Sequence, residues 1–324
     1  MSNMIRFLFT MMVAMLAPAT LFAASEDVVI GCSWGDIAAT LAAPEGGSES
    51  AVLIVAGSGP TDRNGNSGLN LNTYAYKLLS DGLVEAGYAV LRYDKRGIGG
   101  SYLPAEHIPA LLYDDYVEDA ERCVAWLRER GYSRVFIAGH SEGGGIAIEV
   151  AQRGEVDGVV LLAAPGYPMD KVLLWQLSKQ LMPSHVRLFV TSEQILNRLK
   201  RGDSVAEEDI PKELLSLFHP TVQPFLRSSM RRDPRAMIAE CEEPMLIITG
   251  GRDIQVAVEN GERLAAAARN ARHVTFDNMC HVLKDAPSVD RMEQILGVYT
   301  NWQQPLTEAL VPTIVDFLNN VTTK

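Results

Sequence analysis

One short stretch limits what this chain can fold into more than any other. An apolar, β-branched run at residues 135–137 leads into the sequence GHSEG at residues 139–143, and a helical pattern begins directly afterwards. In this strand–turn–helix context, G-x-S-x-G places a serine on a strained turn with its hydroxyl projecting from the sheet edge. The flanking glycines are needed because a Cβ there would crowd the neighbouring strand or helix. The stretch therefore predicts that Ser141 is a nucleophile, with a helix-capping serine as the alternative.

Apolar strands and helical patterns alternate on both sides of this turn. A continuous apolar run at residues 51–56 is typical of a strand that is covered on both faces, and further strands are expected at residues 89–93, 156–163 and 245–249. Residues 28–43 are expected to form an antiparallel hairpin ahead of them. Four or more strand–helix units predict an α/β fold with a mostly parallel, doubly wound sheet.

The alternation stops between residues 167 and 240. This stretch has helical segments interrupted by prolines and no run with the character of a strand. We interpret it as a helical insertion that lies over the carboxyl edge of the sheet and acts as a lid. The core domain is then expected to comprise residues 25–166 and 241–324.

The first 24 residues are expected to lie outside the fold. Arg6 precedes an apolar run from Phe7, and Pro18 and small residues follow up to Ala24. This order predicts a secretory signal peptide cleaved near residues 23–25, and hence an exported protein, periplasmic or secreted. The alternative is an uncleaved membrane anchor, because about 18 apolar residues just span a bilayer. No second apolar run of spanning length follows, so no membrane span is expected after cleavage.

Composition excludes several classes of function. The chain is 47% hydrophobic and 21% charged, which is typical of a globular protein. Its net charge of −11 argues against sequence-independent binding of nucleic acid. It has no C-x-x-C or H-E-x-x-H spacing, so no dedicated metal site is expected.

The residues that follow the later strands offer an acid and a base. Asp253 follows the strand at residues 245–249, and His281 follows the next strand, at residues 274–276. Carboxyl ends of parallel strands meet at one sheet edge, so both side chains are expected beside Ser141. A serine hydroxyl needs a base to accept its proton, and the imidazole needs a partner that fixes its tautomer. Two alternatives are that Asp253 only caps a helix and that Asp277 supplies the carboxylate.

His281 is the only histidine expected at the correct edge late in the chain. His140 adjoins Ser141, but adjacent side chains at a sharp turn point apart. The other four are expected in connections, in the insertion or before a strand, and they are His107, His185, His219 and His273.

Two backbone N–H groups are candidates for binding an oxyanion. That of Glu142 lies at a predicted helix N-terminus, and that of Ser58 lies in the GSG loop after the strand at residues 51–56, with Gly59 as the alternative. Asp62 and Arg63 are expected to pair with each other and hold this loop.

Five spaced motifs resemble those of the α/β-hydrolase family, in particular bacterial serine hydrolases. They are GSGPTDR at residues 57–63, RYDKRGIGGS at 92–101, GHSEG at 139–143, GGRD at 250–253 and NMCH at 278–281. The resemblance covers about residues 28–320 and implies an α/β-hydrolase fold and a Ser–His–Asp mechanism with no cofactor. Many relatives have His-Gly where this chain has Ala56-Gly57, so the loop N–H that faces the oxyanion stays open.

These residues together predict an exported hydrolase that acts on a small-molecule acyl substrate. We expect a carboxylic ester or thioester with an apolar acyl group, because Leu173, Leu174, Trp175 and Leu177 are candidates to line the lid. The same four residues are alternatively only packing within the insertion. A serine peptidase, aminopeptidase-like, is the alternative enzyme, and a non-catalytic ligand-binding module is the alternative of another class.

Overall fold

A computed structural model describes residues 24–68 and 71–321 of the chain. The predicted signal peptide lies outside the described residues except for Ala24, which is the first residue of strand β1 (Ala24–Cys32). Cleavage, export and the alternative of an anchor therefore stay predictions. Within the part of the chain that is described, no helix is both long enough and apolar enough to cross a membrane.

An eight-stranded sheet forms the centre of the molecule, in the order β1-β2-β6-β3-β7-β8-β9-β10. β1 pairs with β2 and β2 with β6 in antiparallel fashion, whereas the remaining neighbours are parallel. This arrangement confirms the predicted hairpin and the mostly parallel sheet. The further strands are β2 (Gly35–Ala43), β3 (Ser50–Val55), β6 (Ala89–Tyr93), β7 (Arg134–His140), β8 (Gly158–Leu162), β9 (Met245–Gly250) and β10 (Ala271–Phe276), with a small separate hairpin of β4 (Asn66–Ser67) and β5 (Leu71–Asn72).

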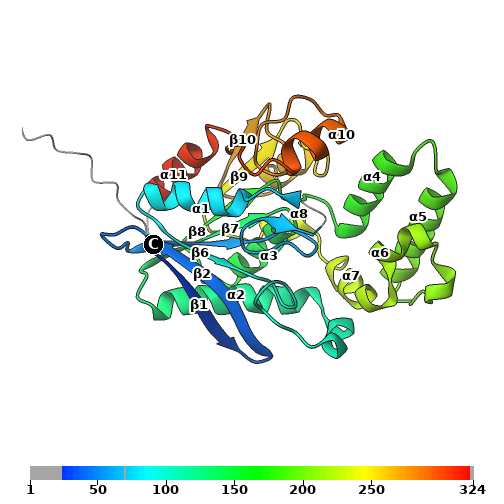
Figure 1. Ribbon diagram of the computed structural model, residues 1–324, viewed down its shortest axis with the longest axis horizontal. Coiled ribbons are helices and arrows are strands. Elements are labelled where there is room, and N and C mark those ends of the chain that lie inside the picture. The colour runs from blue at the N-terminus through cyan, green and yellow to red at the C-terminus, as the bar shows by residue number, and fades with distance from the viewer. Residues whose placement is uncertain (1–23, 69–70, 322–324) are drawn as a thin grey trace, which may run out of the picture.

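Helices cover both faces of the sheet (Figure 1). α1 (Ala75–Glu85) and α11 (Leu310–Asn320) pack on one face, and α2 (Tyr113–Glu129), α3 (Glu142–Gln152) and α9 (Glu259–Ala265) pack on the other. The shorter helices α8 (Pro234–Ile238) and α10 (Arg291–Gln294), the 3₁₀ segment Ala105–Ala110 and the π-helical segment Ile295–Tyr299 complete this part of the chain.

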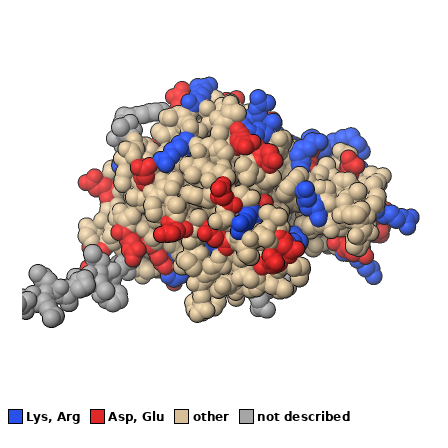
Figure 2. All heavy atoms as spheres, turned by 90° about the horizontal axis from the view of Figure 1, so that it is seen from above, with Lys and Arg blue, Asp and Glu red and all other residues tan. Residues whose placement is uncertain are grey.

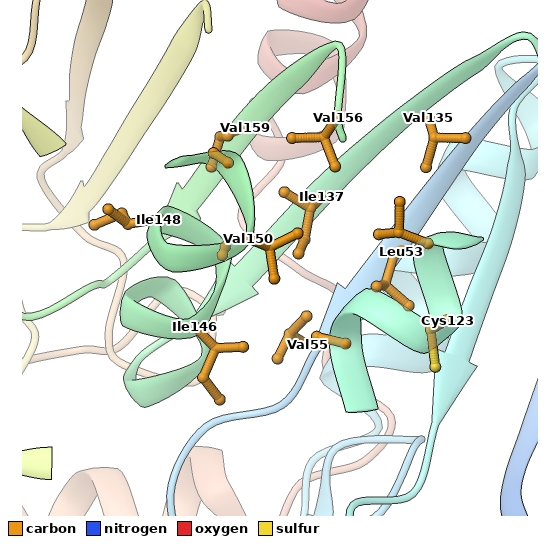
Figure 3. Close-up of a cluster of buried hydrophobic side chains, with 14 of the residues drawn as sticks. Leu53, Val55, Cys123, Val135, Ile137, Ile146, Ile148, Val150, Val156 and Val159 are labelled. Carbon is orange, nitrogen blue, oxygen red and sulfur yellow. The ribbon is translucent and has the colours of Figure 1, made fainter. Parts of the chain in front are cut away.

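Strand β3 shows why the central runs are apolar throughout. Leu53 and Val55 face the α2 and α3 side, while Val52 and Ile54 face the α1 and α11 side, and all four are buried. Figure 3 shows Leu53, Val55 and Ile137 from the sheet facing Ile146 and Val150 from α3. A strand that is covered on both faces is therefore mostly apolar, as β3 is from residue 51 to residue 55.

The insertion has an apolar core of its own. Its helices α4 (Met169–Leu181), α5 (Val186–Lys200), α6 (Leu215–Phe218) and α7 (Gln223–Ser229), which we call the insertion helices, are accompanied by single 3₁₀ turns at Glu207–Asp209, Lys212–Leu214 and Pro220–Val222. Buried residues including Ile195, Leu199 and Phe218 pack together there. Figure 1 shows these helices as a separate body at the right of the view. Ile238 of α8, in contrast, packs in the main core.

Candidate active site

Ser141 lies on a strained turn between β7 and α3. Its backbone has φ 52° and ψ −122°, a conformation rare for a residue with a side chain. The turn is possible only because glycines flank it: a Cβ on Gly139 would lie 2.2 Å from the carbonyl oxygen of Gly143, and one on Gly143 would lie 2.4 Å from that of Val55. The local sequence therefore determines where the Ser141 hydroxyl is presented.

Asp253 and His281 are brought together by the ends of β9 and β10. Asp253 Oδ2 accepts a hydrogen bond from His281 Nδ1 at 2.8 Å, and the carboxylate is fully buried. Its other oxygen accepts from the N–H groups of Gln255 and Val256 at 2.7 and 2.8 Å. Asp253 thus caps the following turn and also orients the histidine. Because a carboxylate only accepts, Nδ1 carries the proton and Nε2 has a free lone pair.

The alternative carboxylate, Asp277, does not serve this histidine. Its side chain is exposed, four residues before His281 on the same loop, whereas Asp253 holds the imidazole. Both oxygens of Asp253 are fixed by buried hydrogen bonds, as expected of a group that sets the orientation of a base.

Ser141 and His281 line one cavity of about 440 Å³, together with Ser58 and Glu142. The insertion supplies apolar side chains to the same cavity, namely Met169, Val172, Leu173 and Leu217. Of the four residues predicted for this role, only Leu173 lines the cavity. Leu174 and Leu177 pack within the insertion, and Trp175 faces an outer groove. The strand ends and the insertion together enclose the space beside the Ser141 hydroxyl.

The two candidate oxyanion residues are in contact. The Ser58 hydroxyl donates to Glu142 Oε2 at 3.1 Å, and a Cβ on Gly57 would lie 3.0 Å from the Cβ of Ser141. The GSG loop therefore lies directly against the serine, and Glu142 is the first residue of α3. Both residues line the same cavity as Ser141.

A buried chain of hydrogen bonds, absent from the sequence prediction, runs beneath the cavity. The Gly57 N–H donates to the Tyr76 hydroxyl at 3.0 Å, Tyr76 lies 2.7 Å from His140 Nδ1, and His140 Nε2 lies 2.8 Å from the carbonyl oxygen of His281. A carbonyl only accepts, so Nε2 carries the proton, Nδ1 accepts, and the tyrosine hydroxyl donates to it. The chain joins the GSG loop to the loop that carries His281.

Burial keeps the imidazole and the hydroxyl of this hydrogen-bonded chain in one protonation state. Burial, with a smaller contribution from the neighbouring His281, lowers the pKa of His140 to about 3. Burial likewise raises the pKa of the Tyr76 hydroxyl, so the oxygen keeps its proton. His140 therefore remains a neutral imidazole with one donor and one acceptor at every pH near neutrality.

Asp94 of the RYDKRG motif anchors Arg63, which ends the GSGPTDR loop. Asp94 accepts from the N–H, Nε and Nη2 of Arg63 at 2.8, 3.0 and 2.9 Å. The expected pair of Asp62 with Arg63 is therefore wrong. Asp62 instead accepts from the N–H groups of Asn64 and Asn66, each at 2.8 Å, so its own turn satisfies it and the guanidinium is free to reach Asp94.

The remaining histidines lie away from the cavity. His273 is inside β10 and contacts Thr249 Oγ1 at 3.0 Å, whereas we had expected it ahead of the strand. His219 lies 3.4 Å from Glu207, and His107 and His185 are exposed. Across residues 24–68 and 71–321, no group of three or more His, Cys, Asp or Glu side chains is arranged to hold a metal ion.

Comparison with known proteins places this geometry in a family. The family model described as "Serine aminopeptidase, S33" matches residues 66–285. The esterase EstD of Thermotoga maritima is 32% identical over 237 residues, which cover 72% of this chain and 54% of EstD. The chain thus spans about half the length of that curated relative.

Solved structures are similar over nearly the whole chain. An esterase of Pyrococcus furiosus has a TM-score of 0.58 at 20% identity, covering 92% of each chain. The esterase EaEST of Exiguobacterium antarcticum has a TM-score of 0.57 at 19% identity, covering 91% of this chain and 100% of EaEST. Est1E of Butyrivibrio proteoclasticus, solved with ferulic acid bound, has a TM-score of 0.56 at 16% identity, covering 91% of this chain and 98% of Est1E. These likenesses confirm the α/β-hydrolase fold.

Proposed function

This chain belongs to the serine aminopeptidase S33 family, and from that premise we propose that it is a serine hydrolase that cleaves carboxylic esters or thioesters of small molecules. One observation carries the proposal above the others. The buried Asp253 carboxylate binds His281 Nδ1 at 2.8 Å, which leaves Nε2 free in the cavity that Ser141 lines. A buried carboxylate that holds Nδ1 and leaves Nε2 free is the arrangement that orients a histidine as the base of a serine nucleophile.

Each group has a role in the proposed reaction. The Ser141 hydroxyl oxygen attacks the acyl carbonyl while His281 Nε2 takes its proton, and Asp253 stabilises the imidazolium that forms. The N–H groups of Ser58 and Glu142 bind the oxyanion. His281 then gives the proton to the departing alcohol or thiol, leaving an acyl-enzyme. Water attacks the acyl-enzyme with His281 again as base, and the acid product and free Ser141 are regenerated.

The cavity supports an ester with an apolar acyl group. Its insertion side is mostly apolar: Met169, Val172, Leu173 and Leu217 line it beside Gln176, and they suit an acyl chain rather than a charged residue. EstD and the similar structures from Pyrococcus furiosus and Exiguobacterium antarcticum are named esterases, and Est1E was solved with ferulic acid bound. Aliphatic and hydroxycinnamic esters are therefore the first substrates to compare.

A fluorophosphonate probe tests the nucleophile. Wild-type protein should be labelled once, and Ser141→Ala should not be labelled. Wild-type protein that resists labelling, or equal labelling of both proteins, would favour the non-catalytic binding module.

A substrate panel then separates the two enzymatic functions. We expect turnover of p-nitrophenyl esters of graded chain length and little turnover of aminoacyl or peptidyl anilides. The family's own description makes amide hydrolysis the alternative, and faster turnover of the anilides would establish it.

We also propose that residues 1–24 are a signal peptide and that the mature enzyme is periplasmic or secreted. The order of Arg6, the apolar run and the small residues before Ser25 supports this. Mass spectrometry of the mature protein should find a new N-terminus near residues 23–25. An intact N-terminus in the membrane fraction would favour the anchor.

A further inference from the structure

Lys95 is a buried cation that none of the roles above uses. It follows β6, its side chain is 2% exposed, and it fills the variable position of the RYDKRG motif. Its ammonium donates to the carbonyl oxygen of Gly57 at 2.5 Å. A fully buried lysine is rare because its charge must leave water, so its location calls for a specific partner.

Two neighbours surround the ammonium besides that carbonyl. Glu142 Oε1 lies 4.0 Å from Nζ, and the ring of Tyr116 lies 5.3 Å from it. The contact with Glu142 is at the outer limit for an ion pair, and Glu142 Oε2 already accepts from Ser58. Burial lowers the pKa of Lys95, and the carboxylate of Glu142 opposes that shift. The short hydrogen bond to Gly57 is therefore the principal contact of this charge.

The Gly57 carbonyl belongs to the same peptide unit as the Ser58 N–H. A peptide unit is planar and trans, so the N–H points opposite to the C=O. Anchoring the Gly57 oxygen on Lys95 therefore fixes the direction in which the Ser58 N–H points. The preceding peptide is anchored as well, because the Gly57 N–H donates to the Tyr76 hydroxyl at 3.0 Å.

The charge of Lys95 also acts along this peptide. A cation at the carbonyl oxygen draws electron density from the amide nitrogen, and hydrogen bonds in series strengthen one another in a medium of low dielectric constant. The Ser58 N–H at the other end of the unit is then a better donor. Such a donor is set before the reaction begins, which is how an oxyanion hole stabilises a transition state.

We propose that Lys95 is a positioning residue that orients and polarises the Gly57–Ser58 peptide as one donor of the oxyanion hole. This inference rests on the proposed hydrolase function. It assigns the oxyanion donor of this loop to Ser58 rather than Gly59, and it gives a role to the lysine at the variable position of the RYDKRG motif. The role differs from that of a counter-ion for Glu142, which would affect folding but not the binding of an oxyanion.

The test replaces the charge by a group of similar length. In Lys95→Met, kcat for p-nitrophenyl butyrate should fall about 10- to 100-fold at unchanged KM, less than the loss of a whole oxyanion donor. The inhibition constant of a matching trifluoromethyl ketone, whose serine adduct carries an oxyanion, should rise by a similar factor. Lys77→Met, an exposed lysine of α1 paired with Asp81, is the matched control and should match wild type in both measurements.

A second variant tests whether the loss in Lys95→Met comes only from an unpaired buried carboxylate. Lys95→Met/Glu142→Gln removes both buried charges, so no carboxylate is left without its neighbour, and it should show the same loss of ketone affinity. A folded Lys95 variant with wild-type kcat and ketone affinity would overturn the proposal, as would a fall in kcat with ketone affinity unchanged. Failure of the proposed function is a distinct result, because wild-type protein would then turn over no ester.

Discussion

The loops after the strands and the insertion helices form the two sides of one cavity, but different forces hold them. The loops are fixed by buried polar contacts: Asp253 to His281, Tyr76 to His140, and Lys95 to the Gly57 carbonyl. The insertion helices are held by apolar side chains such as Ile195, Leu199 and Phe218. A hydrogen bond restricts both the distance and the angle between its donor and acceptor. Apolar packing, in contrast, tolerates replacement of one side chain by another of similar volume.

The two sides also differ in charge. Residues 167–240 contain 11 of the 29 Lys and Arg residues but 9 of the 40 Asp and Glu residues. Figure 2 shows Lys and Arg side chains gathered over the insertion at the right of the view. The excess of acid thus belongs to the core, and the insertion offers an anionic product a rim without net negative charge. For the proposed enzyme, the comparison leads us to expect that the loops set the chemistry and that the insertion sets the choice of substrate.

The largest effect is expected from Asp253→Asn. The amide places its own donor against His281 Nδ1 and favours the wrong tautomer, so kcat should fall by about four decades. Because this change lies on the loop side, the loss should be equal for acetyl, butyryl and octanoyl esters. Asp277→Asn is the matched control and should retain nearly full activity. A loss that varied with chain length would break the division between the two sides.

The second effect is the contribution of His140 to the pH dependence of the free energy of unfolding. Its folded pKa of about 3 lies below that of a free histidine, so the unfolded chain binds more protons between these values. This contribution to stability is complete above about pH 6.5 and is lost as the pH falls. Protonation of His140 should therefore lower the free energy of unfolding by about 2 kcal/mol between pH 7 and pH 5.

Urea unfolding at the two pH values measures this contribution. His140→Gln should lower stability at pH 7 but reduce the fall between the two pH values by that amount. His185→Gln, an exposed position in the insertion, should keep the wild-type fall. Equal falls in wild type and His140→Gln would show that His140 is not held neutral by the fold.

The third effect comes from Tyr76→Phe, which removes one hydroxyl from the chain beneath the cavity. The Gly57 N–H loses its acceptor and His140 Nδ1 loses its donor. We expect kcat to fall about tenfold at unchanged KM, because the oxyanion loop is loosened rather than deleted. Tyr88→Phe removes a comparable hydroxyl, bonded to Asn319 at 2.7 Å, and should leave kcat unchanged. A rise in KM alone would place Tyr76 in substrate binding instead.

Local patterns were enough to predict the fold and the strand ends that carry the candidate residues Ser141, Asp253 and His281. The glycines around Ser141 are required by close backbone approach, which is a property of a few neighbouring residues. Asp253 and His281 follow apolar strands, and parallel strands bring their carboxyl ends to one edge. The mostly parallel sheet and the contact of Asp253 with His281 therefore agree with predictions based on strand periodicity and chain order.

Contacts between distant residues were not predictable in the same way. Tyr76 meets His140 across 64 positions, and Lys95 meets Gly57 across 38, and neither pair has a signal in spacing or composition. Helix α4 illustrates a second limit. Leu173 lines the cavity while Leu174 and Leu177 pack inside the insertion, because the helix is apolar on more than one face and its pattern does not single out the side that meets the substrate.

An effect of the same size as that of Tyr76→Phe, but confined to long-chain substrates, tests the insertion side through these same leucines. Leu173→Trp should narrow the acyl end of the cavity, so kcat/KM for octanoyl esters should fall about tenfold while that for acetyl esters stays near wild type. Leu174→Trp changes the neighbouring residue in the same manner, but Leu174 faces the packing of the insertion, so the ratio of the two substrates should not change. Melting temperatures of both variants show whether overpacking has destabilised the fold. Such destabilisation lowers stability without altering selectivity between the two substrates. A selectivity change in Leu174→Trp but not in Leu173→Trp would mean that α4 presents its other face to the substrate.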